Sequence, residues 1–131
     1  MEQYLRYVAA VVGTAAHYLW GGWDAVLMAL VVLAALDFVT GVLAAVVNKE
    51  VDSSIGARGV IRKVTMFAIV AVANILDSVL DMPDPMLRTA VIWFYIVVEG
   101  TSILENAGAA GVPIPDAIRK VLGRLKDDSD N

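Results

Sequence analysis

The sequence contains no cysteine and a single histidine, His17. Without cysteine the chain can form neither a disulfide nor a thiolate nucleophile or metal site, and one histidine cannot build a metal cluster alone. Basic residues are also in deficit, because 10 Lys and Arg stand against 14 Asp and Glu. Nucleic-acid binding requires clustered positive charge. We therefore expect no nucleic-acid partner, no cofactor and no bound metal.

Charge of either sign is scarce. Charged residues make up 18% of the chain and hydrophobic residues 59%, and the mean hydropathy is +0.70. A soluble domain usually has about 25% charged and 45–50% apolar residues, so this chain lacks the polar surface to cover its apolar content. The stretch from Ala25 to Asn48 carries one charge and exceeds the roughly 20 residues that cross a bilayer. The sequence predicts an all-α integral membrane protein.

Helix-breaking residues divide the chain into four apolar segments. Gly21 and Gly22 end the first, and the turn "DMPDP" separates the third from the fourth, with Asp84 as the expected N-cap and Pro85 at the first helical position. We expect spans at residues 25–47, 59–80 and 86–107, within a transmembrane core of residues 23–112. Residues 1–22 hold an apolar run that is shorter than a usual span. They form either an interfacial helix or a short fourth transmembrane helix, which gives three to four spans.

Lys and Arg are distributed unevenly, and this predicts the orientation. Four lie between residues 49 and 63 and four between residues 119 and 126, whereas residues 77–88 hold three aspartates and one arginine. Cytoplasmic loops carry the excess of Lys and Arg. We therefore expect the loop at 49–63 and the C-terminus in the cytoplasm.

Residues 113–131 differ in pattern from the spans. Ile118, Val121, Leu122 and Leu125 fall at helical spacing, and an acidic tail follows. Basic side chains alternate with them: Arg119, Lys120, Arg124 and Lys126. This pattern is typical of a basic amphipathic helix on an anionic membrane surface, although a helix packing on a neighbouring subunit would show the same periodicity.

Polar residues recur at helical spacing inside the expected spans. They are Asp37, Thr40 and Gly41 in the first full span, Lys63 and Asn74 in the next, and Glu99, Ser102, Glu105 and Asn106 in the last. Lipid cannot satisfy such groups, so they must face one another, another subunit or water. A pore-lining face and interhelical hydrogen bonding without transport both fit the pattern.

A direct pair between Asp37 and Lys63 is not expected. Lys63 falls near the inner end of a span that starts at residue 59, whereas Asp37 falls near the centre of its own span. At 1.5 Å per residue the carboxylate lies too deep for the ammonium. We therefore expect hydroxyl and amide partners for Asp37 and Glu99, or pore water. The expected partners are Thr40, Asn74, Ser102 and Asn106.

The stretches "LDFVTGVLAAVVNKEVDSSIGARGVIRK" and "VVEGTSILENAGAAGVPIPDAIRKVLGRL" resemble the bacteriophage lysis holins, a family that includes the holin-like proteins accompanying secreted clostridial toxins. The resemblance covers roughly residues 25–125. The matching residues are Asp37, Thr40 and Gly41, then Ser54, Gly56, Gly59 and Lys63, then Glu99 and Ser102 to Asn106, then Gly111, Pro113 and Pro115.

The resemblance implies a multi-pass, non-enzymatic protein of the bacterial inner membrane. Such a protein forms a homo-oligomer and opens a lesion for a cell-wall hydrolase (endolysin) or a toxin. Two other classes remain open: a small ion channel or transporter subunit, in which Asp37 and Glu99 bind cations, and a membrane scaffold that does not conduct. The sequence shows no nucleophile–base pair, phosphate-binding glycine loop or metal-ligand spacing, so an enzyme is not expected.

Overall fold

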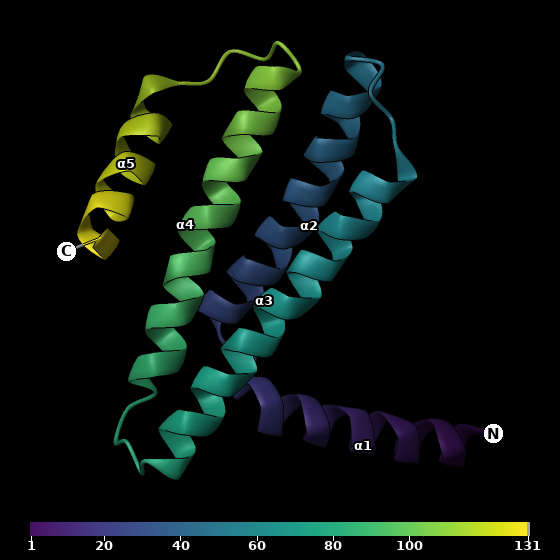
Figure 1. Ribbon diagram of the computed structural model, residues 1–131. Coiled ribbons are helices and arrows are strands. Elements are labelled where there is room, and N and C mark those ends of the chain that lie inside the picture. Colours follow the sequence, from purple (N-terminus) through teal and green to yellow (C-terminus); the bar gives the residue numbers. More distant parts are fainter. Residues whose placement is uncertain (131) are drawn as a thin grey trace.

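The computed structural model describes residues 1–130, with side chains up to residue 128. Asn131, the end of the expected acidic tail, lies outside the described residues. The chain forms α-helices only within this range (Figure 1): α1 (Glu2–Trp20), α2 (Ala25–Val47), α3 (Ser53–Val79), α4 (Met86–Ala109) and α5 (Asp116–Asp130). The expectation of an all-α chain is confirmed.

Three of these helices, α2, α3 and α4, are long and apolar enough to cross a membrane. The observed α2 has the expected bounds, and α4 ends two residues beyond them. Helix α3 begins at Ser53, six residues before the expected start, and that expectation was wrong. The cause is Asp52, whose carboxylate accepts the backbone N–H of Ser54 at 2.8 Å and caps the helix.

The start of α4 also differs from the expectation. Its N-cap is Pro85, which makes no side-chain capping bond, and Asp84 does not take that role. The cap comes instead from Asp77 in the last turn of α3, which accepts the backbone N–H groups of Leu87 at 3.0 Å and Arg88 at 2.8 Å. A carboxylate at a helix N-terminus satisfies free N–H groups and the helix dipole. Asp77 therefore joins α3 to α4 at this end of the bundle.

The spans pack tightly at one end and separate at the other. Helix α4 contacts both α2 and α3, whereas α2 and α3 contact each other less. The core lies toward the α3–α4 turn, where Leu30, Val70 and Ile92 are completely buried. Toward the α2–α3 loop, α2 and α3 diverge (Figure 1). Asp37, Lys63 and Glu99 lie in this open half.

Helix α1 leaves the closed end of the bundle at a steep angle to the three spans (Figure 1). The turn into α2 passes through Gly21 at φ +78. A Cβ atom on Gly21 would lie 3.0 Å from both Arg88 Nε and Asn74 Oδ1. Only glycine combines this backbone conformation with so close an approach.

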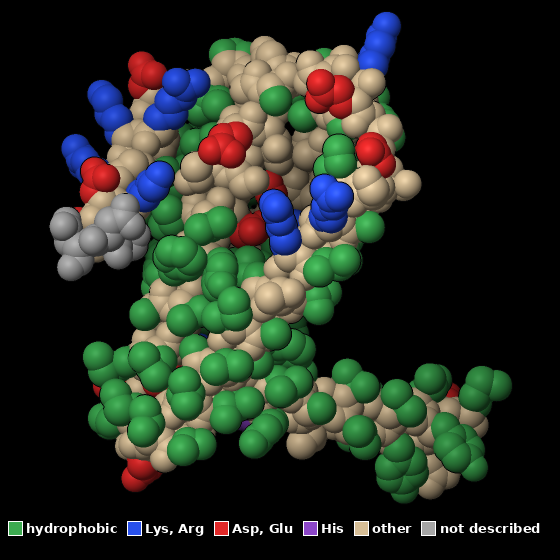
Figure 2. All heavy atoms as spheres, in the orientation of Figure 1, with side chains coloured by type: hydrophobic (Ala, Val, Ile, Leu, Met, Phe, Trp, Pro, Cys, Tyr) green, Lys and Arg blue, Asp and Glu red, His purple; other side chains and the backbone are tan. Residues whose placement is uncertain are grey.

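Helix α5 folds back along α4 of the same chain (Figure 1). Leu122 and Leu125 are half-buried against the bundle, and a Cβ atom on Gly100 would lie 3.3 Å from a methyl group of Leu122. The four basic side chains are exposed, and Figure 2 shows Lys and Arg side chains standing out over α5. The amphipathic pattern of this segment therefore places its apolar side on α4.

Candidate functional site: a polar cluster between the spans

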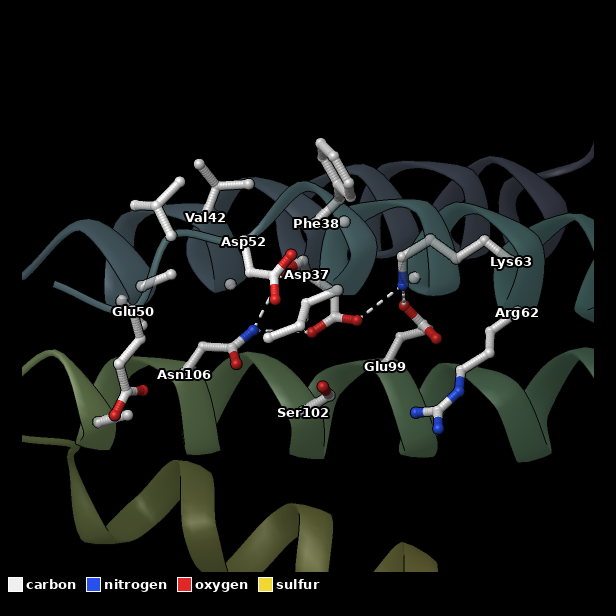
Figure 3. Close-up of a pocket in the computed structure, with 18 of the residues that line it drawn as sticks. Asp37, Phe38, Val42, Glu50, Asp52, Arg62, Lys63, Glu99, Ser102 and Asn106 are labelled. Carbon is white, nitrogen blue, oxygen red and sulfur yellow. Dashed lines mark hydrogen bonds and ion pairs between the residues drawn. The ribbon is translucent and has the colours of Figure 1, made fainter. Parts of the chain in front are cut away.

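One ammonium group joins two carboxylates at the centre of the bundle (Figure 3). Lys63 Nζ on α3 lies 2.7 Å from Asp37 Oδ2 on α2 and 2.5 Å from Glu99 Oε2 on α4. The side chains of Lys63, Asp37 and Glu99 are 18%, 14% and 8% exposed. When all three are ionised, their formal charges sum to one negative charge. The cluster thus connects all three spans and carries one carboxylate charge that no cation within the cluster neutralises.

The expectation that Lys63 cannot reach Asp37 was wrong, and the early start of α3 explains why. Lys63 lies ten residues after Ser53, Asp37 ten residues before Val47, and Glu99 ten residues before Ala109. These helix ends lie at the same end of the bundle (Figure 1). At 1.5 Å per residue, all three charges lie about 15 Å from that end. The ammonium and both carboxylates therefore meet at one depth.

An amide completes the contacts of Asp37. Asn106 Nδ2 on α4 donates to Asp37 Oδ1 at 2.9 Å and to Thr40 Oγ1 at 3.1 Å. The hydroxyl of Thr40 itself donates to the carbonyl oxygens of Leu36 and Asp37. A Cβ atom on Gly41 would lie 3.5 Å from Asn106 Nδ2, at ordinary van der Waals distance, so Gly41 packs directly beside the amide. Four of the expected residues, Asp37, Thr40, Gly41 and Asn106, thus meet at the α2–α4 contact.

The cluster lines a cavity of about 560 Å³ between the diverging halves of the spans. Ser102 lines it beside Asp37 and Glu99, and Glu50, Asp52 and Arg62 line it toward the α2–α3 loop. Figure 2 shows acidic side chains in this hollow, in the half of the molecule that also displays Lys and Arg. The cavity offers room for water next to the charges, since it is both polar and large.

Two of the expected site residues lie elsewhere. Asn74 faces α1, and its amide donates to the carbonyl oxygens of Tyr18 at 3.0 Å and Leu19 at 3.1 Å. It therefore caps the C-terminal end of α1, and the expectation that it partners a buried carboxylate was wrong. Glu105 is exposed on α4, and so are Arg119 and the other basic residues of α5.

Arg88 is a second site of buried charge and is not among the polar residues expected from the sequence pattern. Its side chain at the start of α4 is 3% exposed. Nη1 and Nη2 bind the carboxylate of Asp24 at 2.8 and 3.2 Å, Nε donates to the carbonyl of Trp20 at 2.6 Å, and Nη2 donates to that of Gly22 at 2.9 Å. We refer to these contacts as the Arg88 clamp. An arginine just inside one apolar segment, with an aspartate at the start of another at the same membrane face, was the signal in the sequence.

The clamp also sets the ionisation of Asp24. The hydrogen bonds from the Arg88 guanidinium lower the pKa of this carboxyl below its usual value, and the backbone N–H of Leu27, which the same carboxylate caps, lowers it further. Asp24 thus has two roles, because it begins α2 and holds α4. The clamp therefore fixes the junction between α1 and α2 at the closed end of the bundle.

The polar cluster brings charges from three helices into contact beside a cavity. Among the described residues, no group of three or more His, Asp and Glu side chains is arranged to hold a metal ion. Asp37, Lys63 and Glu99 hold three helices together when their charges contact one another. The same charges can instead contact water in the cavity. Intramembrane charges of this kind mark ion or water pathways and helix interfaces.

Comparisons with known proteins relate the chain to bacteriophage holins. The bacteriophage holin family model matches residues 14–127. A protein named probable holin from Bacillus phage phi105 is 39% identical over 101 residues, which is 77% of this chain and 74% of that protein. An uncharacterised 14.9 kDa protein from the nagH 3′ region of Clostridium perfringens is 40% identical over 95% of this chain and 94% of its own length. No solved structure matches the chain.

Proposed function

Because the chain belongs to the bacteriophage holin family, we propose that it is a holin that assembles with further copies of itself in the bacterial cytoplasmic membrane. The assembly opens a lesion, and a cell-wall hydrolase or a toxin passes through it. The chain itself supplies no catalysis in this role. Each chain changes from a closed helical bundle into a subunit that lines the lesion and faces water on one side.

The observation that carries this proposal is the cluster of Asp37, Lys63 and Glu99 beside a cavity in the open half of the bundle. In the single chain the charges satisfy one another, and the opposite half is closed by Leu30, Val70 and Ile92. Wider separation of α2 from α3 would expose the charged side chains to water while the apolar faces stay in lipid. Polar groups at this depth are tolerated only under those conditions. The geometry therefore supports a polar face that is stored in the monomer and exposed in the oligomer.

Regulated expression in bacteria tests the function. A holin should give a delay followed by an abrupt loss of membrane potential, and co-expression of a cell-wall hydrolase should then lyse the cells. A channel selective for cations, which the excess carboxylate in the cluster would favour, should give a graded ionic current without release of the hydrolase. A scaffold should give neither result. Either of the last two outcomes would refute the proposal.

The orientation gives a separate prediction. Figure 2 shows Lys and Arg side chains in its upper half, the half that holds the α2–α3 loop. The two arginines elsewhere are Arg6 on α1 and Arg88, which is buried in the clamp. We propose that this end is cytoplasmic, as the positive-inside rule requires, and that the α3–α4 turn faces outward. In intact cells, Ser53→Cys should resist an impermeant thiol reagent and Met82→Cys should react. The native chain contains no cysteine, so each label reports one position, and the reverse pattern would overturn the orientation.

Helix α5 adds a lipid contact to the proposed function. Packed on α4, it holds Arg119, Lys120 and Arg124 beside the inner half of the spans, where a charge facing lipid costs up to about 3 kcal/mol. Gly111 at φ +82 and the prolines at 113 and 115 form a turn that can redirect the helix. We propose that α5 moves onto the anionic inner leaflet, where each basic side chain contributes about 1 kcal/mol.

A further inference from the structure

Helix α1 is amphipathic, with polar side chains on one side and exposed apolar side chains on the other. Polar and small side chains recur along one side at spacings of three or four residues, the spacing of one helix face. They are Gln3, Arg6, Ala10, Gly13, Thr14 and His17. The opposite side is apolar and aromatic, and its side chains are exposed: Tyr4, Leu5, Val8, Val11 and Val12. Helix α1 buries none of its residues in the chain, so its apolar face has no partner within the molecule.

The contacts of α1 with α3 and α4 determine where the apolar face of α1 lies. Asn74 holds the C-terminal carbonyls of α1, Trp20 Nε1 donates to the carbonyl of Phe67 at 2.8 Å, and the Arg88 clamp holds the following turn. All of these contacts lie at the closed end of the bundle. From there α1 projects outward at a steep angle to the spans (Figure 1), so it does not run alongside them.

We propose that α1 is a membrane-surface helix that lies in the outer leaflet of the bilayer, with its apolar face on the acyl chains and its polar stripe toward water. The assignment of the outer leaflet rests on the proposed orientation of the bundle. The partner is lipid because the apolar face of α1 continues the apolar surface that α2 and α3 present to lipid. Trp20 and Trp23 lie at the junction, and aromatic residues of this kind concentrate at the membrane–water interface.

The charge of α1 makes the proposal more specific. Its charged residues are Glu2 and Arg6, both in the first two turns, so the helix has no basic face to attract anionic lipid. Binding therefore depends on apolar and aromatic contact with the interface. Helix α1 should bind equally to neutral and to anionic vesicles, unlike α5.

Spin labelling in vesicles tests the depth of α1. The full-length chain, reconstituted in neutral phosphatidylcholine vesicles, would carry single nitroxide labels at Val8→Cys, Ala10→Cys, Val12→Cys and Thr14→Cys. A surface helix should alternate: high access to dissolved oxygen at Val8 and Val12, and high access to a water-soluble nickel chelate at Ala10 and Thr14. Addition of anionic lipid should leave this pattern unchanged. A steady change of depth along the helix would instead indicate a transmembrane segment.

Two further outcomes complete the test. Protection of all four labels from both reagents, with magnetic broadening between copies, would indicate that α1 docks on a second chain, and it would overturn the proposal. In intact cells, Gln3→Cys should react with an impermeant reagent whenever Met82→Cys does, and a reactive Met82→Cys beside a protected Gln3→Cys would also overturn it. These readouts involve no lysis, so failure of the holin proposal and failure of this inference are distinguishable.

Discussion

Replacement of Lys63 by methionine should destabilise the bundle more than replacement of either carboxylate. Lys63 is the ammonium between Asp37 and Glu99. Without it two carboxylates face each other with no cation between them, and the formal charge of the cluster becomes two negative. Removal of one partner from a buried ion pair costs about 3–5 kcal/mol. Equilibrium unfolding in mixed micelles should show this loss, and onset of lysis at matched expression should shift.

The neutral carboxylate variants should behave differently. Asp37→Asn and Glu99→Gln each leave one carboxylate paired with Lys63, so the formal charge of the cluster becomes zero. Both should insert and fold with a smaller loss of stability than Lys63→Met, while the timing of lysis changes because the polar face has lost a charge. Glu99→Gln added to Lys63→Met should recover part of the stability. A neutral variant that is less stable than Lys63→Met would refute the charge argument.

Arg62→Met supplies the matched control. Arg62 precedes Lys63 on α3, lines the same cavity and is exposed. Its removal deletes the same charge at nearly the same depth without opening the contact between the carboxylates. Exposed substitutions usually change stability by about 0.5 kcal/mol or less. Equal losses for Arg62→Met and Lys63→Met would mean that net charge, and not the contact geometry, determines stability.

Much of the fold could be predicted from the sequence because membrane constraints are strict. The length and apolarity of residues 25–47 and 86–107 define two spans almost to the residue, since a helix in lipid must satisfy its own backbone. The start of α3 could not be predicted as well. It depends on the cap at Asp52, and residues 53–58 include two serines, a glycine and an arginine, which suggest a loop.

The start of α3 determined how much of the site could be predicted from the sequence. The sequence indicated that Asp37, Glu99 and Asn106 lie on polar faces, and the structure brings these faces together. The six additional residues in α3 move Lys63 to the depth of both carboxylates, which adds an ion cluster to the expected amide contact between Asn106 and Asp37. Asn74 lies eleven residues further along and reaches α1 instead. The spacing of polar residues thus predicts which helix face they share, whereas the depth of each side chain in the membrane depends on where its helix begins.

Arg88 shows what periodicity alone leaves out. One arginine near the end of an apolar segment usually extends to the headgroups, so its place at the same membrane face as Asp24 in the sequence pattern indicates a pair but not burial. In the structure its guanidinium binds the carbonyls of Trp20 and Gly22 and the carboxylate of Asp24. These partners come together only because the "WGGWD" turn folds under the start of α4. The arrangement is a tertiary feature that no local pattern encodes.

Loss of the Arg88 clamp should free α1 and loosen the closed end of the bundle. Arg88→Met leaves the Asp24 carboxylate and two carbonyl oxygens without their donor, and we expect a loss of about 3–5 kcal/mol in unfolding free energy. Arg88→Lys should recover only part of this, because an ammonium keeps the charge but not the fork that reaches all three partners. Hydrogen exchange of the amides of Gly21 and Gly22 should accelerate in both variants. Arg58→Met, at an exposed position on α3, is the control and should leave exchange at the turn unchanged.

The pH dependence of stability distinguishes the ion pair between Arg88 and Asp24 from the contacts of Arg88 with backbone carbonyls. Since the pKa of Asp24 is lowered in the folded chain, its contribution to stability is fully present above the unfolded pKa of about 3.9 and is lost as the pH falls through the lower folded value. Asp24→Asn should therefore be less stable than the native chain at neutral pH. The difference in melting temperature between the two should shrink below about pH 4. A difference that persists unchanged well below pH 4 would show that the ionised carboxylate of Asp24 does not stabilise the turn, and that Arg88 holds α1 through the carbonyls of Trp20 and Gly22 without the ion pair.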